Sequence, residues 1–390
     1  MRVAIVGGSL GGLTAALVVR DLGIAVDIFE RSPVELAQRG AGIGFLPEAQ
    51  RYLVERAGVS LDRISVATSH IRYLSRQADF TYDGLHDYRF SSWTTVYREL
   101  LACFDPAAYR LDHEMTSWND GDKGVDIQFA DRPAQHADLL ICADGVGSLA
   151  RARLLPELEP KYAGYIAWRG MVPEKLLDAR MRGVFDDAIT YYVYANSHVL
   201  VYPIPGLDGS VKSGERLINY VWYRNYMEGG DLDNVLTDNT GQRRDISLPP
   251  GAASEKHVAE LRATAAARLP DPMAKLVQRT EQPFLQVVYD LEVPRMAFGR
   301  VCIIGDAAFA VRPHAAAGTA KAASDAWALA AALSENNDLT AALAKWESGQ
   351  LDVGRQLLDR TRKIGRRSQV DCDWEPGDPE FIFGLHGPGI

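Results

Sequence analysis

Hydrophobic residues near the start and the end of the chain form short unbroken runs, and glycine or aspartate follows most of them. The runs lie at residues 2–6, 25–29, 138–144 and 300–306. Between the first two, residues 13–21 carry Ala, Leu and Val at helical spacing, and an alanine-rich helix is predicted over 319–332. Unbroken apolar strands that alternate with helices are typical of a parallel sheet in an α/β domain.

From residue 161 to 289 the pattern changes to short runs with a period of two, rich in aromatic and β-branched residues. These runs lie at 165–172, 189–194, 198–204 and 217–224, with turn residues at 195–197 and 205–209. Such runs predict an antiparallel sheet, and one face of that sheet is free to look into a cavity.

The two patterns predict two domains. We expect a discontinuous Rossmann-like α/β domain made of 1–75, 95–160 and 290–370, and an antiparallel-sheet domain at 161–289. Helical spacing over 340–370 predicts a helix that packs back on the first domain. Residues 371–390, with several prolines and glycines, predict an irregular C-terminal tail.

Composition narrows the classes of partner. The chain of 390 residues has a net charge of −9, which disfavours nucleic acid and anionic membranes and leaves a small molecule as the expected ligand. Its four cysteines lack the spacing of a metal site or a disulfide framework, so we expect no metal and a reducing cytoplasm. We expect neither a signal peptide nor a membrane span. A second copy of the chain stays open as a partner.

The turn after the first strand fits the dinucleotide fingerprint at its first and third glycines, with Ser9 at the second. Gly7 permits the sharp turn, Gly12 lets helix and strand approach, and the free N–H groups at the helix start attract a pyrophosphate. Glu30 ends the second strand, where an acidic side chain accepts hydrogen bonds from a ribose. The candidate cofactor contacts here are Gly7, Ser9, Leu10, Gly11, Gly12, Glu30 and Arg31. A nicotinamide dehydrogenase fits these residues too, and a glycine turn without a ligand is the structural alternative.

Two later strands also end in aspartate. Residues 143–151 read ADGVGSLAR, with Asp144 at the strand end. Asp306 follows the run at 300–306 in the sequence GDAA, and a helix is predicted to begin near Gly318. A capping or turn role for either aspartate alone is the structural alternative.

Together, the three segments resemble the set carried by the single-component FAD-dependent aromatic hydroxylases, the para-hydroxybenzoate hydroxylase-like family. The resemblance implies that FAD is the cofactor and that NADH or NADPH reduces it transiently. It assigns Asp306 to the ribityl chain, Gly318, Thr319 and Ala320 to the flavin pyrimidine edge, Asp144 and Arg151 to the shared FAD and reductant region, and Arg98 to the FAD phosphates. Ser9, Phe309 and Ala320 depart from the residues that many members carry.

In the strand at 198–204, His198 and Tyr202 project from one face. A neutral imidazole and a phenol so placed could relay a proton from a bound hydroxyl to solvent, whereas a turn histidine and a core tyrosine are the alternative. Segments 162–170, 198–205 and 312–318 resemble family members that act on hydroxypyridines, which implies that His198 and Tyr202 help to deprotonate the substrate hydroxyl. By position we expect His314 near the flavin as a third catalytic candidate, and Pro313, Tyr220 and Trp222 at the substrate.

The expected function is hydroxylation of an electron-rich hydroxylated ring, such as 2,6-dihydroxypyridine, with NAD(P)H and O2 through a flavin C4a-hydroperoxide. Gly44 stands where a related enzyme has a histidine, which disfavours a carboxylated pyridine held in the same way. A phenol or benzoate-type substrate stays open, and so does a non-hydroxylating FAD-binding reductase or sensor. A flavin halogenase fits less well, since residues 168–173 lack the second tryptophan of its motif.

Overall fold

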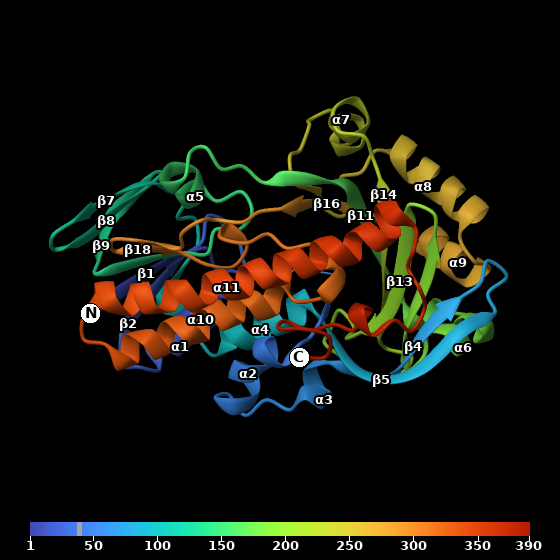
Figure 1. The fold of residues 1–390 in the computed structure, drawn as a ribbon, viewed down its shortest axis with the longest axis horizontal. Helices are drawn as coiled ribbons and strands as arrows, with labels where there is room; N and C mark the ends of the chain where they lie inside the picture. Colours follow the sequence, from blue (N-terminus) through green and yellow to red (C-terminus); the bar gives the residue numbers. More distant parts are fainter. Residues whose placement is uncertain (37–40) are drawn as a thin grey trace.

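A mostly parallel sheet forms the centre of the first domain (Figure 1) in the computed structural model, which describes residues 1–36 and 41–390. In spatial order the described strands are β17 (Ala297–Phe298), β18 (Val301–Ile303), β10 (Leu139–Cys142), β1 (Arg2–Val6), β2 (Ala25–Phe29) and β6 (Tyr109–Arg110). From β18 to β6 neighbouring strands run parallel, and only β17 pairs antiparallel. Their apolar runs are buried, as the sequence predicts for strands covered on both faces.

Different structures cover the two faces of this sheet. Helices α1 (Leu10–Arg20), α10 (Gly318–Glu335) and α11 (Leu339–Arg366) pack together on one face, with α2 (Pro47–Glu55), α3 (Leu61–Ile64) and α4 (Trp93–Ala102) nearby. The other face is covered by a three-stranded sheet of β7 (Met115–Gly121), β8 (Gly124–Phe129) and β9 (Arg132–Ala137), and α5 (Leu149–Leu154) follows β10. This small sheet was not predicted from the sequence.

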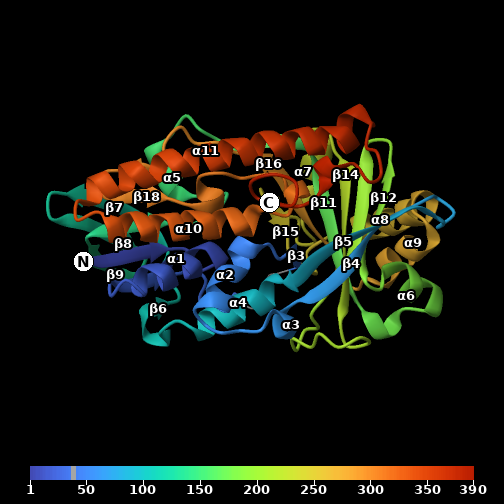
Figure 2. The ribbon, with the colours of Figure 1, turned by 60° about the horizontal axis from the view of Figure 1, so that its bottom comes forward.

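A second sheet with nine described strands forms the other half of the molecule (Figure 2). Its order is β15 (Ser247–Leu248), β16 (Phe284–Asp290), β11 (Lys161–Pro173), β14 (Leu217–Asn225), β13 (Ser197–Ile204), β12 (Ala188–Tyr194), β4 (Val66–Leu74), β5 (Phe80–Ser92) and β3 (Gly42–Gly44). Most neighbours are antiparallel, as predicted, and β12 with β4 is a parallel pair. Strand β4 lies within the segment that the sequence assigns to the first domain, so the boundary there differs from the prediction.

The two faces of the second sheet have different neighbours. One face carries Trp168, Tyr220 and Trp222 and is buried under α6 (Ala179–Phe185), α7 (Gly230–Leu236), α8 (Glu255–Arg268) and α9 (Asp271–Arg279). The opposite face carries Tyr202 and Tyr223 and looks toward α10, α11 and the C-terminal residues. The fold class, a Rossmann-like α/β domain joined to an antiparallel sheet, is therefore confirmed.

The end of the chain returns to the middle of the molecule. After α11 and a π-helical turn (Arg367–Asp371), the tail is irregular except for a 3-10 turn (Pro379–Phe381). Figures 1 and 2 both place the C-terminus between the two halves. Along the described segments, no helix combines the length and the apolar character needed to cross a bilayer.

Candidate active site

The carboxyl ends of β1, β10 and β18 lie next to one another at one edge of the parallel sheet. Gly7 follows β1, Asp144 comes two residues after β10, and Asp306 comes three residues after β18. Open α/β sheets bind ligands at this edge because the strand ends and the N-termini of the following helices converge there. The structure thus brings together the three motifs that are far apart in the sequence.

Close backbone contacts fix the motifs to one another. A Cβ atom added to Gly12 would lie 1.9 Å from the Gly7 carbonyl oxygen, and one added to Gly7 would lie 2.3 Å from the Ala143 carbonyl oxygen. Gly7 also has a φ of +101°, which side chains disfavour. Arg151 donates to the Ala307 carbonyl across 3.2 Å, which joins the second motif to the third. Only glycine allows the fingerprint turn to approach the segment after β10 this closely.

The third motif is fastened from helix α10. The Gly305 N–H donates to the Asp325 carboxylate across 2.9 Å, and Asp325 also pairs with Lys321 one turn earlier. Both charged side chains are almost fully buried, so each compensates the other. The Lys321 ammonium also offsets part of the effect of burial on Asp306. This arrangement holds Asp306 at the edge of the sheet.

A cavity of about 640 Å3 lies over the fingerprint turn, and we call it the nucleotide cavity. Gly7, Ser9, Glu30, Arg31 and Asp144 all line it, as the sequence analysis expects. The two carboxylate oxygens of Glu30 accept from the N–H groups of Gly8 and Ser32, each across 2.9 Å, which orients the carboxylate. Leu10, Gly11 and Gly12 form the first turn of α1 behind this wall and do not line the cavity.

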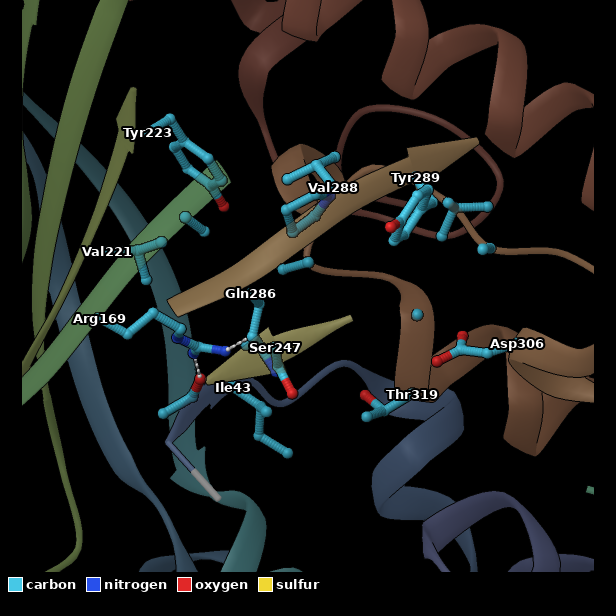
Figure 3. Close-up of a pocket in the computed structure, with 18 of the residues that line it drawn as sticks. Ile43, Arg169, Val221, Tyr223, Ser247, Gln286, Val288, Tyr289, Asp306 and Thr319 are labelled. Atoms are coloured by element: carbon cyan, nitrogen blue, oxygen red, sulfur yellow. Dashed lines mark hydrogen bonds between the residues drawn. The ribbon is translucent and has the colours of Figure 1, made fainter. Parts of the chain in front are cut away.

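A second cavity of about 320 Å3, the substrate cavity, lies between the two domains (Figure 3). Asp306, Gly318 and Thr319 line one side, and the antiparallel sheet supplies Val221 and Tyr223 on the opposite side. Ala320, expected here, is buried in the core and lines neither cavity. Ile43, Arg169 and Gln286 line both cavities, so the two spaces adjoin along one cleft.

The residues present fit FAD. One oxygen of the Asp144 carboxylate is buried and has no hydrogen-bond partner among the described residues, and Asp144 lines the nucleotide cavity. Burial raises the pKa of Asp144 and raises the pKa of Asp306 to about 6, which marks both as groups that gain from a hydroxyl or amide donor. A long cleft with glycine backbone at one end and the N-terminus of α10 at the other matches an extended dinucleotide.

We expect the raised pKa of Asp306 to make the stability of the FAD-free protein depend on pH. The folded protein binds this proton more tightly than the unfolded chain does, so the stability due to protonation is lost as the pH rises through about 6. Asp306→Asn removes the titration. The melting temperature of Asp306→Asn minus that of wild type should therefore be larger at about pH 7.5 than at about pH 5. Calorimetry of both FAD-free proteins checks this, and equal differences at the two pH values would contradict it.

Arg98 does not take the place predicted for it. It lies on α4 with an exposed side chain that donates to the Leu207 carbonyl across 3.3 Å, and it lines neither cavity. The side chain points toward the loop around Leu207. Only the packing of α4 decides this orientation, so the sequence offered no signal for it.

The predicted pair His198 and Tyr202 is separated in the structure. Tyr202 lines the substrate cavity and stacks on Phe90 with ring centroids 4.3 Å apart. His198 lies on the same face of β13 but is 1% exposed, receives a hydrogen bond from Gln369, and does not line the cavity. Burial lowers the pKa of His198 to about 3, so the imidazole is neutral at pH 7. In the described part of the chain, no hydrogen bond joins His198 to Tyr202.

His314 also lies behind the cavity wall. It forms a 2.6 Å hydrogen bond between its Nε2 and the Tyr165 hydroxyl, and burial lowers its pKa well below the usual range. Its ring packs against Tyr223 at 4.8 Å and against His198 at 5.2 Å. Pro313, the residue before it, does line the cavity. The two histidines therefore support Tyr223 from behind and have no surface in the cavity.

Tyr220 and Trp222 are the clearest corrections. Both project from the face of β14 that is buried under the outer helices, so they cannot contact a ligand in the substrate cavity. The residues between and after them, Val221 and Tyr223, line the cavity instead. Successive strand residues point to opposite faces of the sheet. The prediction assigned Tyr220 and Trp222 to the cavity face, whereas they lie on the opposite one.

Two further residues at the cavity, Arg169 and Phe383, were not predicted from the sequence. Arg169, on the cavity face of β11, donates to the Gln286 side chain across 2.9 Å and to the Gly42 carbonyl (Figure 3). Arg169 is the single cation that lines the substrate cavity among the described residues, and no carboxylate within this set pairs with it. Phe383 reaches the same cavity from the C-terminal tail. The position of Arg169 inside an aromatic strand could have indicated its place at the cavity. No local pattern indicates the place of Phe383.

Comparisons with known proteins agree with this geometry. A family model described as FAD binding domain-like matches residues 162–290, and another described as FAD binding domain matches 284–361. The chain is 39% identical over 98% of its length to 2,6-dihydroxypyridine 3-monooxygenase of Paenarthrobacter nicotinovorans, covering 96% of that protein. It is 27% identical to 6-hydroxynicotinate 3-monooxygenase of Bordetella bronchiseptica, with 98% and 94% of the two chains covered.

Solved structures show the same likeness. The structure of 2,6-dihydroxypyridine-3-hydroxylase from Arthrobacter nicotinovorans superimposes with a TM-score of 0.93 at 38% identity, covering 98% of this chain and 96% of that one. Klebsiella pneumoniae HpxO complexed with FAD and uric acid gives a TM-score of 0.77 at 21% identity, with 95% and 89% covered. At that identity the second likeness is one of fold.

Proposed function

Because this chain belongs to the family of FAD-dependent aromatic monooxygenases, we propose that it hydroxylates a hydroxypyridine without a carboxylate, with 2,6-dihydroxypyridine as the first candidate. The observation that carries the proposal is the lining of the substrate cavity among the described residues: aromatic and aliphatic walls, the phenols of Tyr202, Tyr223 and Tyr289, and the single guanidinium of Arg169. The relative that is 39% identical is named for 2,6-dihydroxypyridine, which supports this choice of ring.

In the proposed assignment, each end of the cleft holds one part of FAD. The fingerprint backbone, Glu30 and Asp144 hold the nucleotide end, while Asp306 and the N-terminus of α10 hold the flavin end. When bound, FAD accepts a hydride from NADH or NADPH and activates O2 for transfer to the ring. The apolar walls keep water away from that chemistry.

We place the enzyme in the cytoplasm, where its four free cysteines stay reduced. Thiol labelling in intact cells checks that state.

Tyr202 and Arg169 prepare the substrate in this proposal. Burial raises the pKa of Tyr202, and the nearby Arg169 guanidinium acts against that rise, so the phenol keeps its proton at neutral pH. A neutral phenol donates a hydrogen bond to the oxygen of an ionised ring hydroxyl. The positive charge of Arg169, without a carboxylate partner in the described residues, favours the same ionised form. Ionisation makes the ring more electron-rich, which the transfer of oxygen requires.

The same cavity argues against a carboxylated substrate. Gly44 leaves no side chain where the related enzyme has a histidine, because a Cβ there would lie 2.5 Å from the Cβ of Ala316. Arg169 is already required for the ring oxygen, and the described lining offers no second cation for a carboxylate. His198 and His314 enter the proposal as positioning residues, since both pack against Tyr223 and neither reaches the cavity.

A substrate screen tests the proposal. The purified protein should be yellow, and 2,6-dihydroxypyridine should stimulate its NADH or NADPH oxidation with a product one oxygen atom heavier, hydroxylated at carbon 3. We expect 6-hydroxynicotinate and 4-hydroxybenzoate to give at least about tenfold less product. Mass spectrometry of the products and oxygen consumption are the measurements. Faster hydroxylation of either carboxylated ring would overturn the assignment, and oxidation of NAD(P)H without any hydroxylated product would favour a reductase.

A further inference from the structure

A third cavity of about 730 Å3 lies beside the substrate cavity, and we call it the outer cavity. The start of α2, strands β4 and β5, and the C-terminal tail form its walls. It shares two lining residues, Gly44 and Phe383, with the substrate cavity. These two residues are therefore the border between the two spaces.

The substrate cavity thus has two borders with neighbouring cavities. Ile43, Arg169 and Gln286 form its border with the nucleotide cavity, along the cleft that the proposed function assigns to FAD. With FAD in that cleft, a substrate does not pass there. The border at Gly44 and Phe383 is then the remaining route for an aromatic molecule. This step rests on the proposed function.

The ring of Phe383 lies across this second border. Its centroid is 4.7 Å from that of Tyr88, which lines the outer cavity, and 6.4 Å from that of Phe90, which lines the substrate cavity. Tyr88 and Phe90 are two residues apart on β5 and point to the same side. Phe383 is only 5% exposed, so its ring closes the gap between the cavities.

The backbone on both sides of Phe383 is fixed, whereas its side chain has no polar tie. Arg360 on α11 donates to the carbonyl oxygens of Glu380, Ile382 and Gly384. The Phe383 N–H donates to the Tyr88 hydroxyl across 3.0 Å, and the Gly384 N–H donates to the Ala315 carbonyl across 3.2 Å. Rotation of the ring about its χ angles is therefore the smallest motion that opens the border.

The outer cavity contains polar atoms that suit a hydroxylated ring. The Thr68 hydroxyl and one carboxylate oxygen of Glu48 are buried without a hydrogen-bond partner among the described residues, and both side chains line this cavity. Buried polar groups without a partner are costly, so they favour water or a polar ligand beside them. A hydroxypyridine can satisfy both groups on its way inward.

From these observations we infer that the aromatic substrate enters through the outer cavity and passes the Phe383 side chain, which acts as the door to the substrate cavity. The C-terminal tail then serves as the frame of this door, fastened by Arg360. The outer cavity is a transient binding site for the same hydroxylated ring.

Narrowing the outer cavity tests the route. Ala67 is exposed on β4 and lines the outer cavity but not the substrate cavity. In Ala67→Trp holoenzyme, the association and dissociation rates of 2,6-dihydroxypyridine should both fall at least about fivefold, because a higher barrier slows entry and exit equally. The Kd should stay within about twofold, since neither end state changes. Ala107→Trp is the control, since Ala107 is exposed and lines none of the three cavities.

Stopped-flow absorbance of the oxidised flavin, without NAD(P)H, measures these rates. A second variant, Phe383→Ala, should raise both rates, and it should increase quenching of flavin fluorescence by acrylamide, a readout that needs no substrate. Unchanged rates in Ala67→Trp, or unchanged quenching in Phe383→Ala, would overturn the route. Wild-type protein that binds the ring but never hydroxylates it overturns the proposed function and leaves the route intact.

Discussion

Gly12→Ala should produce a folded protein that has lost FAD. The new methyl group would lie 1.9 Å from the Gly7 carbonyl oxygen, and a backbone oxygen cannot turn aside as a side chain does. The start of α1 must then move away from the end of β1, and its N–H groups lose their aim at the pyrophosphate. Overpacking of this kind costs about 1–3 kcal/mol, so we expect the Kd for FAD to rise by up to about 100-fold.

A matched glycine separates this effect from a general effect of alanine. Gly183 lies inside α6, and no heavy atom lies within 4 Å of a Cβ built there. Gly183→Ala should keep FAD fully bound and should even stabilise the helix by about 1 kcal/mol. Flavin absorbance after purification and fluorescence titration measure the FAD content and affinity, while circular dichroism checks the fold. A yellow Gly12→Ala protein with wild-type affinity would remove the fingerprint turn from the proposed FAD site.

The convergence of the three motifs was predictable because local patterns encode it. Strands at 2–6 and 25–29 have the bounds that the apolar runs indicate, and β10 and β18 lie within the predicted runs. Parallel strands present their carboxyl ends at one edge, so an aspartate after such a run must lie near that edge. Neither inference requires knowledge of how distant segments pack.

The composition of the cavity wall was not predictable in the same way. Period two groups Tyr220 with Trp222 and Val221 with Tyr223, but it does not say which pair faces the ligand. That choice depends on which face α8 and α9 cover, and those helices follow β14 in the chain. The aromatic character of Tyr220 and Trp222 fits a core under helices as well as a cavity wall.

The place of His198 depends on a contact that is remote in sequence. Gln369 and Trp374 close over the histidine, and Trp374 in turn donates to the Tyr73 hydroxyl, a residue 301 positions away. Without the returning tail, His198 would stand on the open face of β13 as the strand pattern predicts. The same C-terminal tail brings Phe383 to the substrate cavity. The burial of His198 and the position of Phe383 therefore have one cause.

Tyr202→Phe should separate hydroxylation from oxidation of NAD(P)H. The ring that stacks on Phe90 is retained and only the hydroxyl is lost, so we expect FAD to stay bound and the substrate cavity to keep its shape. Without the phenol, the ionised substrate oxygen loses its hydrogen-bond donor. Removal of one hydrogen-bond donor to such a negative oxygen costs about 100- to 1,000-fold in rate, and we expect a loss in hydroxylation near the lower value because Arg169 remains.

Tyr220→Phe is the control for this change. It also removes a phenol oxygen from the nine-stranded sheet, but on the face that is buried under the outer helices. Its hydroxylation rate should stay within about twofold of wild type. Product formation, oxygen consumption and hydrogen peroxide release are compared for the three proteins at equal FAD content. In Tyr202→Phe, NAD(P)H oxidation should continue with peroxide as the main product, because the proposed assignment gives the phenol no part in the reduction of FAD. Equal losses in the two variants would show that the phenol of Tyr202 acts through packing, and full coupling in Tyr202→Phe would transfer the preparation of the substrate to Arg169 alone.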